Sequence, residues 1–575
     1  MRRTSKLLAL GVVTAFAMAA CGSDSAKSTT TGGTTAESAT TLAAATDTTP
    51  ATEPVAETSA PAAAGGTFVF GTSSDPVVLD GAYVSDGESL RVIDQIFETL
   101  VTTAPGATDI VPALAKSWEA SADGLAWTFD LRTGVKFHDG TDFNAAAVCF
   151  NFDRWYHFTG VAQSAAVSYY WNTVFGGFSD GATPSLYKSC EAKGDATAVI
   201  TLNSPSAAFL SGLAVSSFAI ASPDALAKYE ADKVGGTDDA PTFDGTFGTE
   251  HPIGTGPFKF DSWTPGDKLT IVRNDDYWGD KSILDTVIFK PIADGPARRT
   301  ALEAGEIQGY DLVDPGDTTA LADAGFQVLK RPAFNVGYVG FNQAKPPLDN
   351  LKIRQAIAYA LNRQALVTAK YPEGSEVATQ FQPPLVFGHS DNVPVYDYNP
   401  DTARQLIADS GVTNPTLEFY YPSDVSRPYM PDPTANFEAF KADLEAVGFT
   451  VVPKTAPWRS GYLDDVDAGN AQIYLLGWTG DFGDPDNFVG TFFRTPQKAW
   501  GFDNKDIFDA LTTARDTADP DTRTKLYQEA NDKIMEFLPG VPYVHTQPSL
   551  AFADGVKGYV PSPVSLESFA TVSVG

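Results

Sequence analysis

The stretch that most constrains the fold of this chain runs from residue 416 to residue 488. Three short segments in it are rich in apolar, β-branched and aromatic residues, which indicates buried strands: TLEFYYP (416–422), FTVV (449–452) and AQIYLL (471–476). Between the first two, apolar residues recur at helical spacing before a glycine: Phe437, Phe440, Leu444, Val447 and Gly448. A second helical segment is expected around residues 458–468. This β-α-β-α-β order predicts parallel strands joined by right-handed crossovers, and therefore an α/β fold.

Polar loops follow two of these strands. The loop GWTGDFGDPDNF (477–488) contains Asp481, and the loop SDVSRPYMPDP (423–433) contains Arg427. Because ligands bind beyond the carboxyl ends of strands in open α/β sheets, we expect Arg427 and Asp481 to face one crevice. A cation and an anion held apart in this way match a zwitterionic ligand. Asp484 and Asp486 stand in Asp-Pro and Asp-Asn pairs, which are typical of turns.

The two loops resemble the ligand loops of dipeptide-binding proteins, within family 5 of the extracytoplasmic solute-binding proteins of ABC transporters, which binds peptides and nickel. Further segments match the family in the same order: residues 112–118, 123–124, 129–140, 254–258, 277–278, 353–357 and 556–559. The resemblance extends from about residue 66 to the C-terminus. It implies a two-lobed α/β periplasmic-binding-protein (Venus flytrap) fold with an extra β-rich subdomain, and capture of short peptides, most simply dipeptides, for a membrane importer.

The resemblance also implies a division of the chain. The first lobe would comprise residues 66–110, 244–337 and 547–575, with the β-rich subdomain at 111–243, and the second lobe would comprise 338–546. Roughly 510 residues exceed what one hydrophobic core supports, so the residue count independently favours several domains. The protein is expected to be a monomer that delivers its ligand to a permease. Gly254-Thr-Gly256 lacks the GK[ST] ending of a P-loop, so ATP hydrolysis is expected in separate subunits of the importer.

By resemblance, Asp481 would hold the α-ammonium of a peptide and Arg427 its carboxylate, as a charge-assisted pair. The peptide backbone would pair with a strand edge at Gly477, Trp478 and Thr479. Three further candidates are expected near the ligand: Trp458, Tyr169 and Ser85. Pro428 follows Arg427 where relatives usually have alanine, which leaves the peptide length open. Each tryptophan could instead belong to the core.

The first residues form a secretion signal. MRRTSK is basic, and residues 7–18 are apolar but too few to span a bilayer, which needs about 20 residues. The signal ends in Ala-Met-Ala-Ala before Cys21, which resembles the lipobox of bacterial lipoproteins. Residues 1–20 would be removed, and Cys21 would carry a lipid. Residues 21–65 are rich in Thr, Ala and Pro, which predicts a disordered tether to the outer face of the cell membrane.

Charge and cysteine content limit the environment of the protein. A net charge of −31 argues against nucleic-acid binding and against a basic membrane-binding surface, so the lipid would be the sole membrane contact. With Cys21 assigned to lipidation, Cys149 and Cys190 remain as an even pair in an oxidising compartment. We expect a disulfide between them, with two buried free thiols as the alternative.

Other motifs do not predict catalysis. Residues 177–181 match GxSxG around Ser179, but Pro184 follows and no helical pattern succeeds it, as a nucleophile elbow would require. His138 and Asp139 stand in a turn sequence. The five histidines have no ligand spacing and there is no CxxC, so we expect no catalytic site, metal or cofactor. The alternatives left open are other solutes on the same scaffold (oligopeptide, glutathione, oligosaccharide, haem or a nickel chelate) and a secreted hydrolase.

Overall fold

The computed structural model describes residues 65–238 and 240–575, except for the side chains of residues 459 and 460. The predicted signal, the predicted lipidation site Cys21 and the predicted tether up to residue 64 lie outside the described residues.

The first lobe is built on a seven-stranded sheet with the order β10-β11-β12-β1-β13-β20-β14. Its strands are β1 (Thr67–Thr72), β10 (Phe258–Thr264), β11 (Lys268–Arg273), β12 (Thr286–Pro291), β13 (Gly309–Tyr310), β14 (Gln327–Lys330) and β20 (Ser549–Phe552). Strand β1 lies parallel to β12 and β13, and the outer strands are antiparallel. The carboxyl end of β1 leads to helix α1 (Gly87–Ile96), whose N-terminal residue follows the capping carboxylate of Asp86. This places the start of α1 beyond the carboxyl end of a central strand, where ligands bind in sheets of this kind.

A four-stranded antiparallel sheet forms the β-rich part of this lobe. Its order is β4-β5-β7-β6, with β4 (Ala115–Ala120), β5 (Ala126–Leu131), β6 (Tyr187–Ala192) and β7 (Thr197–Leu202). Apolar and polar residues alternate along β5, where Phe129 and Leu131 are buried and Thr128 and Asp130 are exposed. Helix α2 (Ala145–Tyr156) packs against β6, and a disulfide joins Cys149 of α2 to Cys190 of β6, with a Cα–Cα distance of 5.1 Å.

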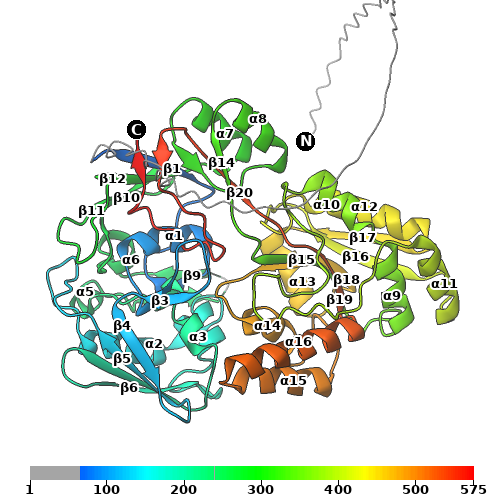
Figure 1. The fold of residues 1–575 in the computed structure, drawn as a ribbon, viewed down its shortest axis with the longest axis horizontal. Coiled ribbons are helices and arrows are strands. Elements are labelled where there is room, and N and C mark those ends of the chain that lie inside the picture. Colours follow the sequence, from blue (N-terminus) through cyan, green and yellow to red (C-terminus); the bar gives the residue numbers. More distant parts are fainter. Residues whose placement is uncertain (1–64, 239) are drawn as a thin grey trace, which may run out of the picture. The chain divides into compact units, whose positions relative to one another are not determined.

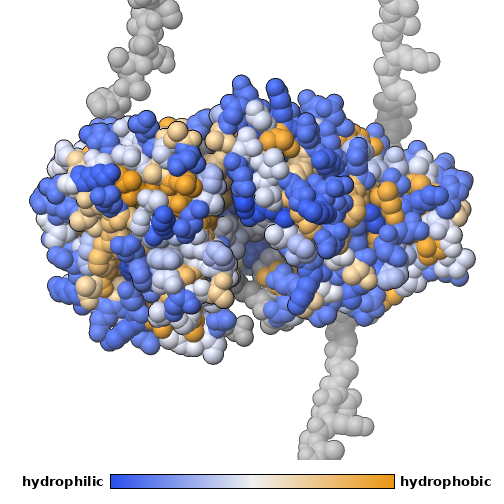
Figure 2. Space-filling view, turned by 90° about the horizontal axis from the view of Figure 1, so that it is seen from below, coloured by the Kyte–Doolittle hydropathy of each residue, from blue (hydrophilic) through white to orange (hydrophobic). Residues whose placement is uncertain are grey.

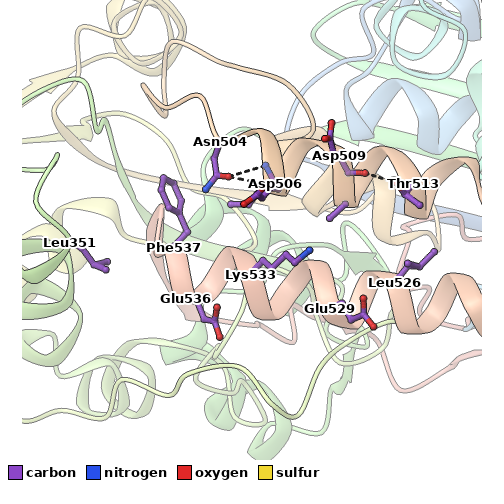
Figure 3. A pocket seen from close by; sticks show the side chains of 12 residues that line it. Leu351, Asn504, Asp506, Asp509, Thr513, Leu526, Glu529, Lys533, Glu536 and Phe537 are labelled. Atoms are coloured by element: carbon purple, nitrogen blue, oxygen red, sulfur yellow. Dashed lines mark hydrogen bonds between the residues drawn. The ribbon is translucent and has the colours of Figure 1, made fainter.

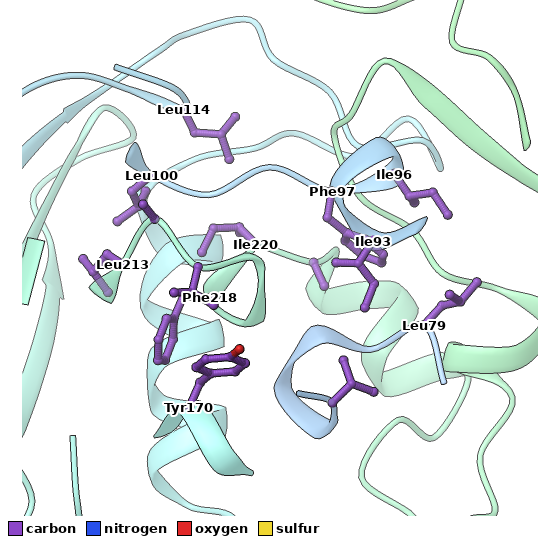
Figure 4. Packing of buried hydrophobic residues seen from close by; sticks show 14 of the residues in the cluster. Leu79, Ile93, Ile96, Phe97, Leu100, Leu114, Tyr170, Leu213, Phe218 and Ile220 are labelled. Carbon is purple, nitrogen blue, oxygen red and sulfur yellow. The ribbon is translucent and has the colours of Figure 1, made fainter. Parts of the chain in front are cut away.

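Shorter elements complete the first lobe. The short strands are β2 (Val101–Thr103), β3 (Ile110–Pro112), β8 (Val234–Thr237), β9 (Ala240–Phe243), β21 (Val556–Lys557) and β22 (Ser573–Val574). The helices are α3 (Tyr169–Val174), α4 (Phe209–Gly212), α5 (Pro223–Lys228), α6 (Phe247–Glu250), α7 (Gly295–Glu303) and α8 (Thr318–Asp323). The 3₁₀ turns are η1 (Gly81–Tyr83), η2 (Gly160–Gln163), η3 (Ser216–Phe218) and η4 (Pro315–Asp317). Residues of α1, α3 and η3 share one apolar cluster, in which Ile93, Tyr170 and Phe218 lie close together (Figure 4).

The second lobe is built on a five-stranded sheet with the order β17-β16-β18-β15-β19. Its strands are β15 (Asn335–Phe341), β16 (Thr416–Pro422), β17 (Thr450–Ala456), β18 (Ile473–Thr479) and β19 (Gly540–Val544). Strand β16 is parallel to both β17 and β18, which confirms the predicted β-α-β-α-β unit. Strand β18 continues three residues beyond the predicted run to Thr479, because Gly477, Trp478 and Thr479 pair with β15.

Helices cover both faces of this sheet, as Figure 1 shows for the yellow and orange part of the chain. They are α9 (Leu351–Ala360), α10 (Arg363–Lys370), α11 (Pro400–Ser410), α12 (Pro433–Ala446), α13 (Leu463–Asp467), α14 (Val489–Phe493), α15 (Lys505–Asp516) and α16 (Pro520–Phe537). A π-helical turn, η5 (Trp458–Tyr462), precedes α13, and a 3₁₀ turn, η6 (Pro485–Asn487), precedes α14. The predicted apolar stripe of α12 is buried at Phe437, Phe440 and Leu444.

The chain passes between the two sheets twice. Residues 331–334 connect β14 to β15, and residues 545–548 connect β19 back to β20. The two connections are bonded to each other, since Arg331 N donates to Pro548 O at 2.9 Å and Asn335 Nδ2 donates to Thr546 O at 3.0 Å. Paired connections of this kind allow two lobes to move about a shared hinge.

No helix among the described residues is long and apolar enough to cross a membrane. Seen from below, the body is mainly hydrophilic at the surface and is hollowed where the two lobes meet (Figure 2).

Candidate functional site

A cavity of about 560 Å³ is lined by residues of both lobes. The second lobe contributes Arg427, Pro428 and Tyr429 from the loop after β16, and residues 477–482 from β18 and the loop after it. The first lobe contributes the start of α1, the tyrosines of α3 and the turn η3. The volume of the cavity falls within the range of about 300–1,000 Å³ that is usual for small-molecule sites. The cavity therefore lies at the carboxyl ends of parallel strands, as predicted for the two polar loops.

Asp481 is held by neutral hydrogen-bond donors. Tyr170 of the first lobe donates its hydroxyl to Asp481 Oδ1 at 2.8 Å, and Asn487 Nδ2 donates to Oδ2 at 3.0 Å. Burial raises the pKa of Asp481 to about 6, although both hydrogen bonds act to lower it. No salt bridge to Asp481 is found in the described part of the chain. A desolvated carboxylate with this set of neighbours is suited to bind an ammonium group supplied by a ligand.

Arg427 stands at the start of a tight turn. Its backbone N–H donates to Met430 O at 3.1 Å, and Met430 N–H donates back to Arg427 O at 2.9 Å. The guanidinium carbon lies 4.8 Å from the ring centre of Trp458, which is a cation–π distance. Pro428 thus sits inside a closed turn, and the side chain of Arg427 lines the cavity.

The turn is held in place by one side chain at the hinge and by another at the end of α10. Thr546 Oγ1 donates to Pro428 O at 2.9 Å, and Tyr371 donates its hydroxyl to Tyr429 O at 3.2 Å. The ring of Tyr429 covers Gly477, where a Cβ atom would lie only 2.2 Å from Tyr429 Cδ2. Glycine at position 477 is therefore required for the turn to approach β18.

One side of β18 has limited strand pairing next to the cavity. Strand β16 pairs with β18 only at Ile473 and Tyr474, whereas β15 pairs along the whole of β18. Gly477, Trp478 and Thr479 consequently have a strand partner on one side only. Their other side lies at the cavity, which places them where an extended ligand could add to the edge.

The remaining predicted residues differ in position. Tyr169 lines the cavity, with its ring centre 6.5 Å from that of Trp478, and Ser85 lines it from the first lobe. Trp458 is buried in the core of the second lobe and does not line the cavity, so its contact with the site is the one to Arg427. Asp484 caps η6 and forms a buried ion pair with Arg523, with N–O distances of 2.6 and 2.8 Å, in agreement with a turn.

Two residues that hold Asp481, Tyr170 and Asn487, are absent from the sequence-based site. Asn487 lies in the same loop and also accepts from Asp481 N at 2.7 Å and from Trp478 Nε1 at 3.2 Å. Its place in an Asp-Asn turn pair concealed this role. Tyr170 lies 311 residues from Asp481 in the chain, and its neighbour Tyr169 carried the only local signal.

A buried ion cluster forms the cavity wall near the hinge. Arg91 of α1 contacts Asp311 at 2.7 Å, and Arg331 of the first connection contacts Glu567 at 2.6 Å. Arg331 also contacts Asp311, and Arg91 contacts Glu88 at 3.1 Å. Burial alone would raise the pKa of Asp311, but the two arginines hold it well below its ordinary value. The cluster joins α1, the hinge and the C-terminal segment into one rigid wall.

Ser179 and His138, the two residues weighed for catalysis, do not line the cavity between the lobes. Ser179 is exposed in a loop that leads to β6, with no helix directly after it. His138 bonds to Gly256 O at 3.0 Å, and burial lowers its pKa to about 4. No group of three or more potential metal ligands occurs within residues 65–238 and 240–575.

A second hollow lies on the outer side of the second lobe, between α15 and α16 (Figure 3). It measures about 640 Å³ and is lined mainly by the polar faces of these two helices. Its carboxylates make local contacts, such as that of Asp509 with Lys505, and all of its lining residues belong to one lobe. It is an open, solvated surface, and the cavity between the lobes has the convergent polar groups of a binding site.

Two α/β lobes joined by paired connections, with a cavity lined from both, define a two-lobed solute-binding protein. The chain belongs to the bacterial extracellular solute-binding proteins, family 5, since the sequence model described as the middle part of that family matches residues 109–500. Families of this type comprise the substrate-binding components of ABC transporters and not enzymes.

Individual relatives agree with this assignment. Heme-binding protein A of Haemophilus influenzae is 32% identical over 542 residues, which cover 91% of this chain and 95% of the relative. The dipeptide-binding protein of Escherichia coli is 32% identical over 497 residues, which cover 83% of this chain and 89% of the relative. An ABC transporter-associated periplasmic binding protein of Helicobacter pylori, solved with the peptide STSA, is similar with a TM-score of 0.72 and 28% identity, covering 89% of this chain and 98% of that one.

Proposed function

We propose that this protein captures short peptides, dipeptides above all, outside the cytoplasm and delivers them to the permease of an ABC importer. One observation carries the proposal: Asp481 and Arg427 stand on the loops after two neighbouring parallel strands and line the same cavity. Asp481 binds the α-ammonium of the peptide and Arg427 its carboxylate. Relatives named for dipeptides, and a similar structure solved with a peptide, support this ligand class.

The remaining predicted site residues have defined roles in this proposal. The peptide backbone adds to β18 at Gly477, Trp478 and Thr479, where the strand has a partner on one side only. Main-chain bonds of this kind are independent of side-chain identity, so they provide affinity without narrow selectivity. Tyr169 and Trp478 flank the ligand side chains, Ser85 bounds the cavity from the first lobe, and Trp458 positions Arg427 by cation–π contact.

Calorimetry with a di-, tri- and tetrapeptide alanine series tests the proposal. Each removal of a charged partner leaves a desolvated ligand charge unpaired, which costs about 2 to 5 kcal/mol. Asp481→Ala should therefore weaken all peptides with a free amino terminus at least tenfold. Arg427→Ala should weaken dipeptides but spare C-terminally amidated ones. Equal affinities across lengths, with no effect of Arg427→Ala, would show that the carboxylate is not bound at Arg427.

Haem is the competing ligand, because one relative is named for it. Haem carries two carboxylates and no ammonium, so Asp481 would have no partner in the ligand. Titration with haemin, followed by its absorption spectrum and by calorimetry, separates the two ligands. Saturable haemin binding that peptides do not displace would replace peptide by haem in the proposal.

The proposal includes attachment through a lipid on Cys21, with residues 21–65 as the tether and the membrane contacted only through the lipid. Cys21→Ser protein should be released from the membrane fraction of cells that lack the importer. Its retention there would contradict the lipid attachment, while leaving the proposal on the ligand unaffected.

A further inference from the structure

The carboxyl group of Asp94 occupies the first-lobe wall of the cavity. Asp94 lies on α1 and lines the cavity, and Ser216 of η3 donates its hydroxyl to Asp94 Oδ1. Both elements are anchored in the core. Ile93, next to Asp94 on α1, and Phe218, the last residue of η3, are buried in the same apolar cluster (Figure 4). Position 94 is therefore a fixed feature of the wall, in contrast to a side chain on a loose surface loop.

The other carboxylates of the first-lobe wall have charged or capping partners. Glu88 is paired with Arg91, and Asp311 with Arg91 and Arg331. Asp86 caps the N-terminus of α1 by accepting from Ser89 N at 2.9 Å. Asp94 differs from these three, since the hydrogen bond found for it within the described structure comes from a neutral hydroxyl.

The two arginines that line the first-lobe wall are already engaged. Arg91 contacts Glu88, Asp311 and Glu567, and Arg331 contacts Asp311 and Glu567. This cluster holds three carboxylates and two guanidinium groups, so it has no surplus positive charge to offer Asp94. In the second lobe, Asp481 and Arg427 are assigned to the two ends of the peptide. Among the carboxylates of this wall, Asp94 is thus the one whose described hydrogen bond comes neither from an arginine nor from a helix N-terminus, and a simple zwitterion supplies no cation for it.

We propose that Asp94 is a specificity-determining residue that binds a cationic ligand side chain, so that the protein prefers short peptides containing lysine, arginine or a similar base. The inference rests on the proposed function and names the ligand class within it. A ligand ammonium or guanidinium pairs with Asp94 and gives the buried carboxylate the charged partner that the wall does not supply. An acidic ligand side chain forms no ion pair at the same position.

The ionisation of Asp94 supports this assignment. Burial raises the pKa of Asp94 to about 8, whereas Ser216 and Arg91 act to lower it and Glu567 acts to raise it further. The carboxyl group of the empty protein therefore holds its proton at neutral pH. A cationic side chain favours the carboxylate, so that its binding transfers this proton from Asp94 to the solvent. The preference for a cationic ligand should accordingly increase as the pH rises from 6 to 8.5.

The experiment compares lysine with norleucine, which has the same four side-chain carbons and lacks the ammonium group. The probes are the dipeptides Lys-Ala and Ala-Lys and their norleucine counterparts, measured by calorimetry with wild type and Asp94→Asn. Wild type should bind at least one lysine dipeptide at least tenfold more tightly than its counterpart. Asp94→Asn should remove that preference while it binds the norleucine dipeptides as wild type does. Asp276→Asn, at an exposed carboxylate, is the matched control and should behave as wild type.

The wild-type protein provides a second readout that needs no variant. The ratio of lysine to norleucine affinities should rise with pH, since the terminal ammonium is common to both peptides and cancels in the ratio. Binding of lysine dipeptides at pH 7 should also release a proton, seen as a dependence of the heat on the buffer. Equal affinities of lysine and norleucine forms, or a lysine preference that survives Asp94→Asn, would overturn the inference and leave the peptide function standing. Failure of all alanine and lysine peptides to bind would overturn both.

Discussion

At the scale of single residues, the buried carboxyl group of Asp481 lowers the stability of the unliganded protein. The carboxyl group is buried against Tyr170 and Asn487, and burial raises its pKa to about 6. In an unfolded chain the pKa of an aspartate is about 3.9, so the native protein binds more protons than the unfolded chain between pH 4 and 6. Stability of the empty protein therefore declines across this interval as the pH rises.

Asp481→Asn should stabilise the empty protein at pH 7 while it weakens peptide binding. The raised pKa corresponds to at most about 3 kcal/mol. An amide can keep both contacts without the buried charge if its oxygen accepts from Asn487 Nδ2 and its nitrogen donates to the Tyr170 hydroxyl, which can also accept. The melting temperatures of variant and wild type should coincide at pH 4 and diverge in favour of the variant at pH 7. A variant that melts below wild type at pH 7, or one that binds peptides normally, would contradict this account of Asp481.

At the scale of elements, the turn that carries Arg427 depends on its contact with β18. Gly477→Ala should both destabilise the protein and weaken peptide binding, because the new Cβ atom would lie 2.2 Å from Tyr429 Cδ2 and 2.5 Å from Val336 O. Relief of that overlap moves the turn or the strand, at a cost of about 1 to 3 kcal/mol. Thermal melts and calorimetry measure the two effects. Gly295→Ala is the control, since its Cβ atom would meet only Arg298 Nη2 at 3.8 Å.

The disulfide between α2 and β6 acts on the β-rich part of the first lobe. It closes a chain segment with a sequence separation of 41 residues, and cross-links of that size typically contribute about 2 to 4 kcal/mol. Reducing agent should lower the melting temperature of wild type, and the double variant Cys149→Ser, Cys190→Ser should be insensitive to it. Two alkylatable thiols in the oxidised wild-type protein would show that the bond is absent in solution.

Sequence periodicity predicted the strands better than the contacts that strands make with one another. Strand β16 was predicted with its exact bounds, because Pro415 precedes the aromatic run and Pro422 ends it. The end of β18 was placed too early, since Gly477 and Thr479 look like loop residues until β15 supplies their partners. Such pairing is a tertiary effect that local propensity does not contain.

The candidate site likewise contains residues that the sequence predicted and residues that only the folded structure brings together. Arg427 and Asp481 were found because each follows a recognisable strand in a distinctive loop. The Arg91–Asp311 contact joins residues 220 positions apart, and the Arg91–Glu567 contact joins residues 476 positions apart. No spacing rule connects such residues, so the ion cluster and the place of Asp94 in the cavity required the folded chain.

At the scale of the whole described body, the loop after β18 binds the two lobes together. Phe482 of this loop is buried in the apolar cluster of the first lobe, although its neighbours in the chain belong to the second lobe. Gly483 lies against Thr108, and the hydroxyl of Tyr170 reaches Asp481. The ligand-binding loop is therefore also a contact between lobes, which links occupancy of Asp481 to the distance between them.

Phe482→Ala should shift the protein toward more open forms. Burying a phenylalanine contributes about 1.5 to 3 kcal/mol, and this contact exists only when the lobes meet, so its loss favours the open population. Small-angle scattering should show a larger radius of gyration for the unliganded variant than for wild type. Saturating peptide should return the variant to the wild-type liganded value, with a weaker apparent affinity because closure must now be driven by the ligand alone.

Phe150→Ala, at a side chain that is 41% exposed on α2, controls for the loss of a phenylalanine elsewhere and should scatter as wild type does. Identical radii and affinities for Phe482→Ala and wild type would mean that this loop does not couple binding to closure, and that the hinge connections at 331–334 and 545–548 alone set the separation of the lobes.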